Sequence, residues 1–212
     1  MAERPLLVLG TGNRKKGLEM ADLVAPVGLD LRTLADFPAA IQVAEDGQTF
    51  AANAAKKAVQ QAQHLHCWVL ADDSGLAVDW LQGAPGVYSA RYSGAGATDA
   101  RNNEKLLAEL AGVPPEQRGA QFVCHLVLAD PRGNIRGEME GACRGRILTG
   151  PRGAHGFGYD PLFEVREYHR TFAELGPVAK AVLSHRARAL RNLLSTLQTL
   201  VDTGQWVAAT SH

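Results

Sequence analysis

The fold of this chain is decided by residues 68–80, which read WVLADDSGLAVDW. Apolar runs occupy residues 68–71 and 76–78, and short continuous apolar runs of this kind predict buried strands. The residues between them, Asp72 to Gly75, are of types that favour turns, so one interpretation is a solvated turn between two strands. The alternative is a cation site, because adjacent carboxylates repel each other and Mg²⁺ takes oxygen ligands, often only one or two carboxylates.

The length of the chain, 212 residues, is enough for one domain with a buried core, and we expect residues 1–212 to form a single domain. The first residues lack the pattern of a signal peptide, and no apolar stretch approaches membrane-spanning length. The three cysteines, Cys67, Cys124 and Cys143, are widely spaced and odd in number, which favours buried free thiols. We therefore expect a soluble, cytoplasmic protein.

The charges of the chain balance, with 22 basic and 22 acidic residues. Such a chain has no overall attraction to nucleic acid or to an anionic membrane, and we expect neither as a partner. Any anion site must therefore be local. The histidines are poor candidates for metal ligands, because His64 and His66 with Cys67 lack the second ligand pair that a zinc site requires.

A candidate phosphate site follows the first predicted strand, Leu6 to Leu9. Residues 10–16 read GTGNRKK, and apolar residues then return at helical spacing. Glycines let the backbone approach an anion, amides at a helix start point at it, and the three cations supply charge. The turn matches neither a Walker loop nor a dinucleotide fingerprint. A basic helix start on a solvated surface is the competing interpretation.

An acidic loop precedes the next predicted helix. Glu45 lies in this loop, and the alanine-rich helix that follows passes through Asn53 and Lys57, with Thr49 as its expected N-cap. Considered alone, Glu45 is an ordinary surface acid. Further along, residues 83–96 form a long glycine-rich loop, and loops of this length are usually functional or disordered.

The second half of the chain predicts antiparallel pairing. Residues 121–129 are apolar on both faces, as in a central strand, and the turn signal PRGN at 131–134 returns the chain from Ile135 as a hairpin. We therefore expect an α/β protein with a mixed sheet flanked by helices. Thr98 and Ser184 are the expected N-caps of two of these helices.

A candidate base site combines an aromatic loop with a basic helix start. Residues 156–161 read GFGYDP, and aromatic residues among glycines suit a loop that stacks on a flat ring and contacts its polar edge. A packed loop tip gives the same pattern. His185 and Arg186 fall in the first turn of the last predicted helix, where cations oppose the helix dipole unless a bound anion or an electron-rich base edge compensates.

Taken together, these segments supply what a nucleoside triphosphate needs: cations and Mg²⁺ for the phosphates, and stacking with edge contacts for the base. They also resemble the Ham1/inosine triphosphatase family, over nearly the whole chain. The matching segments are residues 11–13 with Lys16, Glu45 with residues 47 and 49–50, Asn53, Lys57, and residues 71–76, 83–91, 156–161 and 184–186.

This resemblance implies a mixed α/β fold with an elongated central sheet flanked by helices, and two lobes with the active-site cleft between them, usually in a homodimer. It implies hydrolysis of dITP, ITP and XTP to the monophosphate and pyrophosphate, which removes deaminated purines from the nucleotide pool. Glu45 and Asp73 are implied as Mg²⁺ ligands, with Asp73 also the general base that activates water.

The resemblance also implies contacts with both ends of the nucleotide. The implied phosphate contacts are Thr11, Gly12, Asn13, Arg14, Lys15, Lys16 and Ser74, with Lys57 and Lys180 as further cations. The implied base contacts are Phe157, Gly158, Tyr159, Asp160, His185 and Arg186. A donor opposite the C6 carbonyl, such as the Arg186 guanidinium or a backbone amide, would accept inosine and leave adenine badly paired.

Two other functions are alternatives. A nucleotide-binding module without hydrolysis would keep Lys16 and the Phe157 loop, but it has no need of Glu45 and Asp73 together. A pyrophosphatase similar to the septum-inhibitor proteins would act on pyrimidine nucleotides. The basic helix start and the aromatic loop argue against that second alternative.

Overall fold

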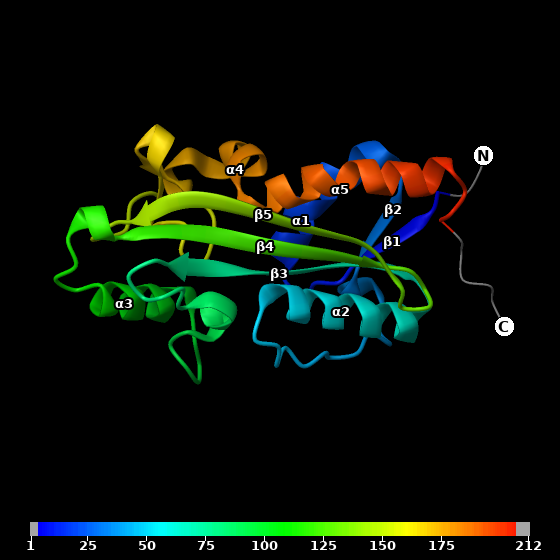
Figure 1. Ribbon diagram of the computed structural model, residues 1–212, viewed down its shortest axis with the longest axis horizontal. Helices are drawn as coiled ribbons and strands as arrows, with labels where there is room; N and C mark the ends of the chain where they lie inside the picture. Colours follow the sequence, from blue (N-terminus) through cyan, green and yellow to red (C-terminus); the bar gives the residue numbers. More distant parts are fainter. Residues whose placement is uncertain (1–3, 207–212) are drawn as a thin grey trace. The chain divides into compact units, whose positions relative to one another are not determined.

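One seven-stranded sheet organises residues 4–206, the part of the chain that the computed structural model describes (Figure 1). The strand order is β2-β1-β3-β4-β5-β6-β7. The strands are β1 (Leu6–Leu9), β2 (Asp30–Thr33), β3 (Trp68–Val78), β4 (Gly119–Ala129), β5 (Ile135–Ile147), β6 (Phe163–Val165) and β7 (Arg170–Thr171). The α-helices are α1 (Arg14–Val24), α2 (Phe50–Leu65), α3 (Asp99–Glu109), α4 (Phe172–Leu183) and α5 (His185–Asp202). Short 3-10 helices are η1 (Ala25–Val27), η2 (Leu34–Asp36), η3 (Gly86–Arg91), η4 (Pro115–Gln117) and η5 (Arg166–Tyr168).

The sheet is mixed, as the sequence predicted. β1 pairs in parallel with both β2 and β3, whereas β6 pairs antiparallel with both β5 and β7. The predicted turn between β4 and β5 is formed by backbone hydrogen bonds that join Asp130 to Gly133 and to Asn134. The Asp130 carboxylate also accepts from the backbone amides of Arg132 and Asn134, which fixes the turn.

The chain divides into two compact units. The first contains the described residues up to Asp73, residues Cys124–Gly141, and the described residues from Arg186 on. The second contains Ser74–Val123 and Ala142–His185. The three long strands β3, β4 and β5 contribute residues to both units.

In the first unit, helices cover both faces of the strands (Figure 1). Trp68 and Leu70 of β3 pack in one core cluster with residues of α1 and α5. Val69 and Ala71 pack in a second cluster, with the buried alanines of α2. Because successive strand residues point to opposite faces, Asp72 continues the α1 and α5 side and the next residue continues the α2 side.

The second unit has its own core. Leu76 and Val78 at the end of β3 pack with Leu106 of α3, with Leu110 directly after that helix, and with residues of β4, β5, β6 and α4. In Figure 1, α3 lies on one side of the strands of this unit and α4 on the other. The buried ring of Phe163 contributes stacked and tilted aromatic contacts to this core.

The solvated turn that residues 72–75 suggested is not present: β3 runs without interruption from Trp68 to Val78. The two carboxylates tolerate a buried strand because alternation separates them onto opposite faces, where each has its own cationic partners. The two predicted strands, residues 68–71 and 76–78, were therefore correct, and the predicted turn between them was wrong.

Several local predictions are confirmed. Thr49 caps α2 and Thr98 caps α3, each through a side-chain oxygen that accepts from a first-turn amide. The cysteines are free thiols. Cys124 and Cys143 are buried, but Cys67 is only half-buried, which corrects the expectation for that residue. Among residues 4–206, no helix is both long and apolar enough to cross a membrane.

Candidate active site

Asp72 lies on the α1 and α5 side of β3 and is 1% exposed. Its Oδ2 accepts from Lys16 Nζ at 3.0 Å and from Arg186 Nη2 at 3.2 Å. Burial alone raises the pKa of Asp72, but Lys16, Arg186 and Lys57 outweigh burial and hold the pKa well below its usual range. Asp72 is therefore a permanent carboxylate that anchors two cations, and it is a poor proton acceptor.

Asp73 lies on the α2 side of the same strand and is also buried. Its Oδ2 accepts from Asn53 Nδ2 at 3.0 Å, and its Oδ1 lies 3.4 Å from Lys57 Nζ. Burial and nearby Glu45 raise the pKa of Asp73, and this outweighs the opposing effects of Lys57, Asn53 and Lys16. Asp73 accordingly holds a proton more readily than an ordinary aspartate, as a general base requires.

Lys57 connects the two predicted metal ligands. Its Nζ contacts Glu45 Oε2 at 3.0 Å as well as Asp73, so a loop acid and a strand acid share one cationic group. Burial lowers the pKa of Lys57, but Asp73, Asp72 and Glu45 together raise it above its ordinary value. The ammonium is therefore charged, and it offsets the repulsion between the two carboxylates.

The donor set around Lys57 fits a magnesium ion, which usually needs one or two protein carboxylates and completes its shell with water and phosphate oxygens. Glu45 and Asp73 already converge on one positive group. Within the described part of the chain, no group of three or more His, Cys, Asp or Glu side chains is placed to hold a metal. Substrate phosphate and water would supply the remaining ligands.

Asn53 is a site residue to which the sequence assigned no role. It is fully buried, and its amide joins two segments: Nδ2 donates to Asp73, and Oδ1 accepts from the Gly47 amide at 2.8 Å. A Cβ at Gly47 would lie 2.7 Å from that oxygen, so the position requires glycine. The signal was the spacing of Asn53 and Lys57, polar residues four apart on an alanine-rich helix face.

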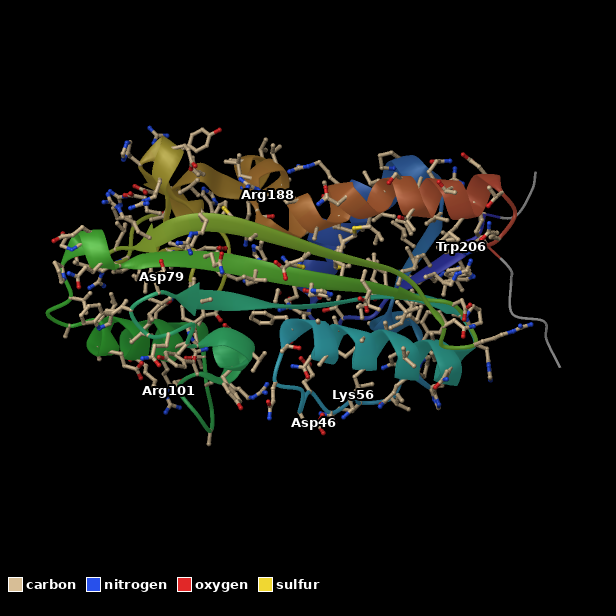
Figure 2. The ribbon with its side chains drawn as sticks, viewed as in Figure 1. Asp46, Lys56, Asp79, Arg101, Arg188 and Trp206 are labelled. Atoms are coloured by element: carbon tan, nitrogen blue, oxygen red, sulfur yellow. The ribbon has the colours of Figure 1, made fainter. Side chains whose placement is uncertain are left out.

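The neighbouring lysine shows the contrast between the two sides of α2. Lys56 pairs with Asp46 at 2.6 Å, and Figure 2 shows both residues on the side of α2 away from the strands. The side chain of Asp46 is 70% exposed. This pair lies at the surface, next in sequence to Lys57, whose pairing with Asp73 is half-buried.

The predicted phosphate turn is organised by its own side chains. Asn13 is the N-cap of α1, and its Oδ1 accepts from the amides of Lys15 and Lys16 at 3.0 and 3.3 Å. Thr11 Oγ1 in turn accepts from the Asn13 amide. Two amides that were expected to point at an anion are thus used for capping. Gly12 and Lys15 are exposed, Lys16 reaches Asp72, and the side chain of Arg14 lies outside the described residues.

The predicted base residues of the second unit form a tight turn from Phe157 to Asp160. Asp160 Oδ2 accepts from the Phe157 amide at 2.9 Å and from Lys180 Nζ at 2.6 Å. The same ammonium lies 3.9 Å from the centroid of the Phe157 ring. Gly156 has a φ of +82°, and a Cβ there would collide with the Asp160 carboxylate, so glycine is required.

The remaining predicted residues take different positions. His185 is buried, and its ring stacks on Phe122 with centroids 4.9 Å apart. Ser74 is half-buried in β3. Tyr159 donates its hydroxyl to the Ser89 carbonyl at 2.8 Å, and burial raises the pKa of this phenol. Arg186 is 1% exposed, between the carboxylates of Asp72 and Glu19.

Solved structures with the same fold define the class of this protein. A Ham1 protein from Coxiella burnetii matches with a TM-score of 0.84 and 37% identity, over 92% of this chain and 99% of that chain. A nucleoside-triphosphatase, also described as a dITP/XTP pyrophosphatase, from Mycobacterium abscessus matches with a TM-score of 0.73 and 44% identity, over 89% and 98% of the two chains. The fold is therefore the α/β fold of Ham1 proteins.

The chain belongs to the Ham1 family, whose sequence model matches residues 7–196. One relative, the dITP/XTP pyrophosphatase of Rhodopirellula baltica, is 58% identical over 196 residues, which cover 92% of this chain and 94% of that protein. The dITP/XTP pyrophosphatase of Desulforamulus reducens is 49% identical over 194 residues, with 92% and 96% covered. The resemblance noted in the sequence is thus confirmed at the level of the family.

Proposed function

We propose that this protein binds a purine nucleoside triphosphate and hydrolyses it. The observation that carries the proposal is the group formed by Glu45, Lys57 and Asp73, in which two carboxylates share one cation. A module that only binds a nucleotide has no need of this arrangement. A hydrolase that acts on a phosphoric anhydride can use the two carboxylates to hold a metal ion and to activate water.

The protein is a dITP/XTP pyrophosphatase, which hydrolyses noncanonical purine nucleoside triphosphates. Identity of 58% over most of both chains supports the same reaction as in the relative from Rhodopirellula baltica. We propose that ITP is also a substrate, and that the reaction removes deaminated purines from the cytoplasmic nucleotide pool.

Asp73 is the proposed general base. Its raised pKa, its two fixed neighbours Asn53 and Lys57, and its place next to a permanent carboxylate suit a group that takes a proton from water. The water oxygen then bonds to the α-phosphorus, the bond from that phosphorus to the bridging oxygen breaks, and pyrophosphate leaves with the bond electrons. The products are the nucleoside monophosphate and pyrophosphate.

A divalent metal ion is expected in this family, and we propose Mg²⁺ held by Glu45 and Asp73. When bound, it supplies positive charge that stabilises the transition state and lowers the pKa of a bound water. Asn53 holds one oxygen of Asp73, which leaves the other oxygen toward Lys57 and Glu45. This orientation is what a shared ligand requires.

Cations of the first unit are the proposed phosphate contacts. Lys16 is held at the α1 start by its bond to Asp72, and Lys57 lies at the carboxylate pair. We propose that they stabilise the charge on the phosphates, together with Ser74, residues 11–13 of the preceding turn and the first two residues of α1, Arg14 and Lys15. Asp72 then acts indirectly: it holds Lys16 in place and is not one of the proposed metal ligands.

The aromatic turn of the second unit is the proposed base site. We propose that Phe157 stacks on the purine and that Gly158, Tyr159 and Asp160, with His185, complete the site. Lys180 holds Asp160 and Phe157 in a fixed relation. For Arg186 to read the C6 carbonyl it must use an N–H beyond those given to Asp72 and Glu19, and a guanidinium carries five.

We further propose that the two units are the lobes of a single domain over residues 1–212, and that two copies associate as a homodimer. Size-exclusion chromatography with light scattering tests the dimer directly. A monomer over the micromolar range would contradict it.

The reaction and its specificity are tested by a panel of dITP, XTP, dGTP, dUTP and dTTP, with Mg²⁺ present or chelated and with pyrophosphate as the measured product. We expect dITP and XTP to be turned over at least about a hundredfold faster than dGTP, because guanine adds a 2-amino group that a site for hypoxanthine and xanthine leaves badly paired. Equal turnover of dITP and dGTP would contradict the purine specificity. Preference for dUTP or dTTP would favour a pyrimidine pyrophosphatase.

A further inference from the structure

Two side chains near the start of α3 contact the aromatic turn, one at the amide and one at the carbonyl of Gly158. Asp99 Oδ2 accepts from the Gly158 amide at 2.7 Å, and Asn103 Nδ2 donates to the Gly158 carbonyl at 3.0 Å. Asp99 and Asn103 are four residues apart, so they lie on the same face of the helix. The peptide groups that flank Gly158 are thereby held by two side chains of one helix.

Apart from the bond from the Tyr159 hydroxyl to Ser89, the other bonds of the turn are local or come from α4. The Phe157 amide donates to Asp160 Oδ2, and the Asp160 amide donates back to the Phe157 carbonyl at 3.2 Å. Gly158 has a φ of +60° and directs its own amide and carbonyl to α3 instead. The contacts with Asp99 and Asn103 therefore join the turn to a rigid element.

The same turn of α3 also fixes the long glycine-rich loop that the sequence singled out. Asn102 Nδ2 donates to the carbonyls of Ser89 and Ala90, and its Oδ1 accepts from the Ser93 amide. The Ser89 carbonyl accepts from the Tyr159 hydroxyl as well. One helical turn thus holds the loop of residues 83–96 and the aromatic turn in a single network of hydrogen bonds.

We propose that Asp99 and Asn103 are positioning residues for nucleotide binding: they hold the aromatic turn in its binding conformation before the substrate arrives. The inference rests on the proposed role of Phe157 and Asp160 in binding the base. A turn that is already ordered loses less conformational entropy on binding. If only a fraction of the protein is in the binding-competent form, the apparent Kd equals the intrinsic Kd divided by that fraction.

The experiment compares steady-state dITP hydrolysis by Asp99→Ala, Asn103→Ala and the unchanged protein. If each variant leaves the turn competent about a tenth of the time, KM rises about tenfold. We expect kcat to stay within about twofold, because uniform binding energy affects KM and not the chemical step. Asp99→Asn keeps an oxygen that can accept from Gly158, and it should restore KM to within about twofold of the unchanged protein.

Two further measurements separate positioning from a general loss of stability. Amide hydrogen exchange should become faster at Gly158 in Asp99→Ala, while the melting temperature changes little. The matched control is Arg101→Ala in the same helical turn: Arg101 bonds to the carbonyls of Ala95 and Gly96, and Figure 2 shows it on the side of α3 away from the strands. We expect this control to leave KM and Gly158 exchange unchanged.

The outcomes distinguish the inference from the proposed function. If Phe157→Ala leaves KM unchanged, the turn is not the base site and the proposed function of that turn is overturned. If Phe157→Ala raises KM, but Asp99→Ala and Asn103→Ala change neither KM nor Gly158 exchange, the positioning role is overturned. It is overturned too if these variants lower kcat and the melting temperature together, since that pattern denotes a structural role.

Discussion

The two faces of β3 carry adjacent carboxylates that behave in opposite ways. On the α1 and α5 face, Asp72 is fixed by Lys16 and Arg186, and its pKa is lowered. On the α2 face, Asp73 has an amide and a shared lysine as partners, and its pKa is raised. Because successive strand residues point to opposite faces, Asp72 anchors two cations while its neighbour Asp73 is a candidate proton acceptor.

This comparison shows that identical side chains in consecutive positions need different partners. A guanidinium and an ammonium on one carboxylate remove its basicity. An amide donor and a lysine that is shared with Glu45 leave the other carboxylate able to exchange a proton or to bind a metal. The neutral hydrogen bond from Asn53 is what orients Asp73 without adding a charge.

The largest expected effect is that of Asp73→Asn on turnover. The variant removes the proposed general base and a metal ligand together, so we expect kcat to fall by about three orders of magnitude. Nucleotide binding, followed by calorimetry, should persist, because the proposed phosphate and base contacts are unchanged. A loss in kcat smaller than tenfold would mean that Asp73 does not have this role.

The next effect is that of Asp72→Asn on stability. It leaves the buried Arg186 and the half-buried Lys16 without their shared carboxylate, and breaking a buried ion pair in this way costs about 3–5 kcal/mol. Urea unfolding measures the change. Asp30→Asn removes an exposed pair with Arg32 and serves as the control, with an expected cost of about 0–1 kcal/mol.

The sign of the Asp72 pKa shift can be read from how the difference in unfolding free energy between the unchanged protein and Asp72→Asn depends on pH. Because the folded pKa lies below the unfolded value near 3.8, the stabilisation by Asp72 is fully present above the unfolded pKa. It is lost as the pH falls from that value toward the folded pKa, at about 1.4 kcal/mol per pH unit. The stability gap between the unchanged protein and Asp72→Asn should therefore be constant from pH 5 to 7 and narrow below about pH 4.

The smallest effect compares two neighbouring lysines on α2. Lys57→Met removes the charge between Glu45 and Asp73, and we expect kcat/KM to fall about a hundredfold. Lys56→Met removes a surface pair with Asp46 and should leave kcat/KM within about twofold. If the two variants had similar activity, the distinction between the two sides of α2 would have no catalytic meaning.

Parts of this architecture could be predicted because their signals are local. The apolar run of β1, the Thr49 and Thr98 caps and the turn before Ile135 each depend on residues close in sequence. The short strands β6 and β7, with three and two residues, have too little periodicity to detect. α4 was missed as well, since Gly176 is not helical and Pro177 follows it, which interrupts the helical pattern.

The candidate site also has a part that the sequence could predict, its member residues, and a part that it could not, their pairing. The order of the matching motifs predicted Glu45, Asp73, Lys16 and the aromatic turn as members of a nucleotide site. The pairing of these residues was not predictable, because Asp72 meets Arg186 across 114 positions and Lys16 across 56. Partners so far apart in sequence are set by how strands and helices pack, for which a single sequence holds no spacing rule.

The sequence by itself determined the family and the α/β class and predicted the residue types of the candidate site, since all three depend on composition and on ordered motifs. The tertiary structure alone decided which carboxylate is the anchor and which is available. The physical reason is that pKa and orientation depend on burial and on the charges within a few ångströms, and these are properties of packing. Asn53, Lys57 and Arg186 acquire their roles only through that packing.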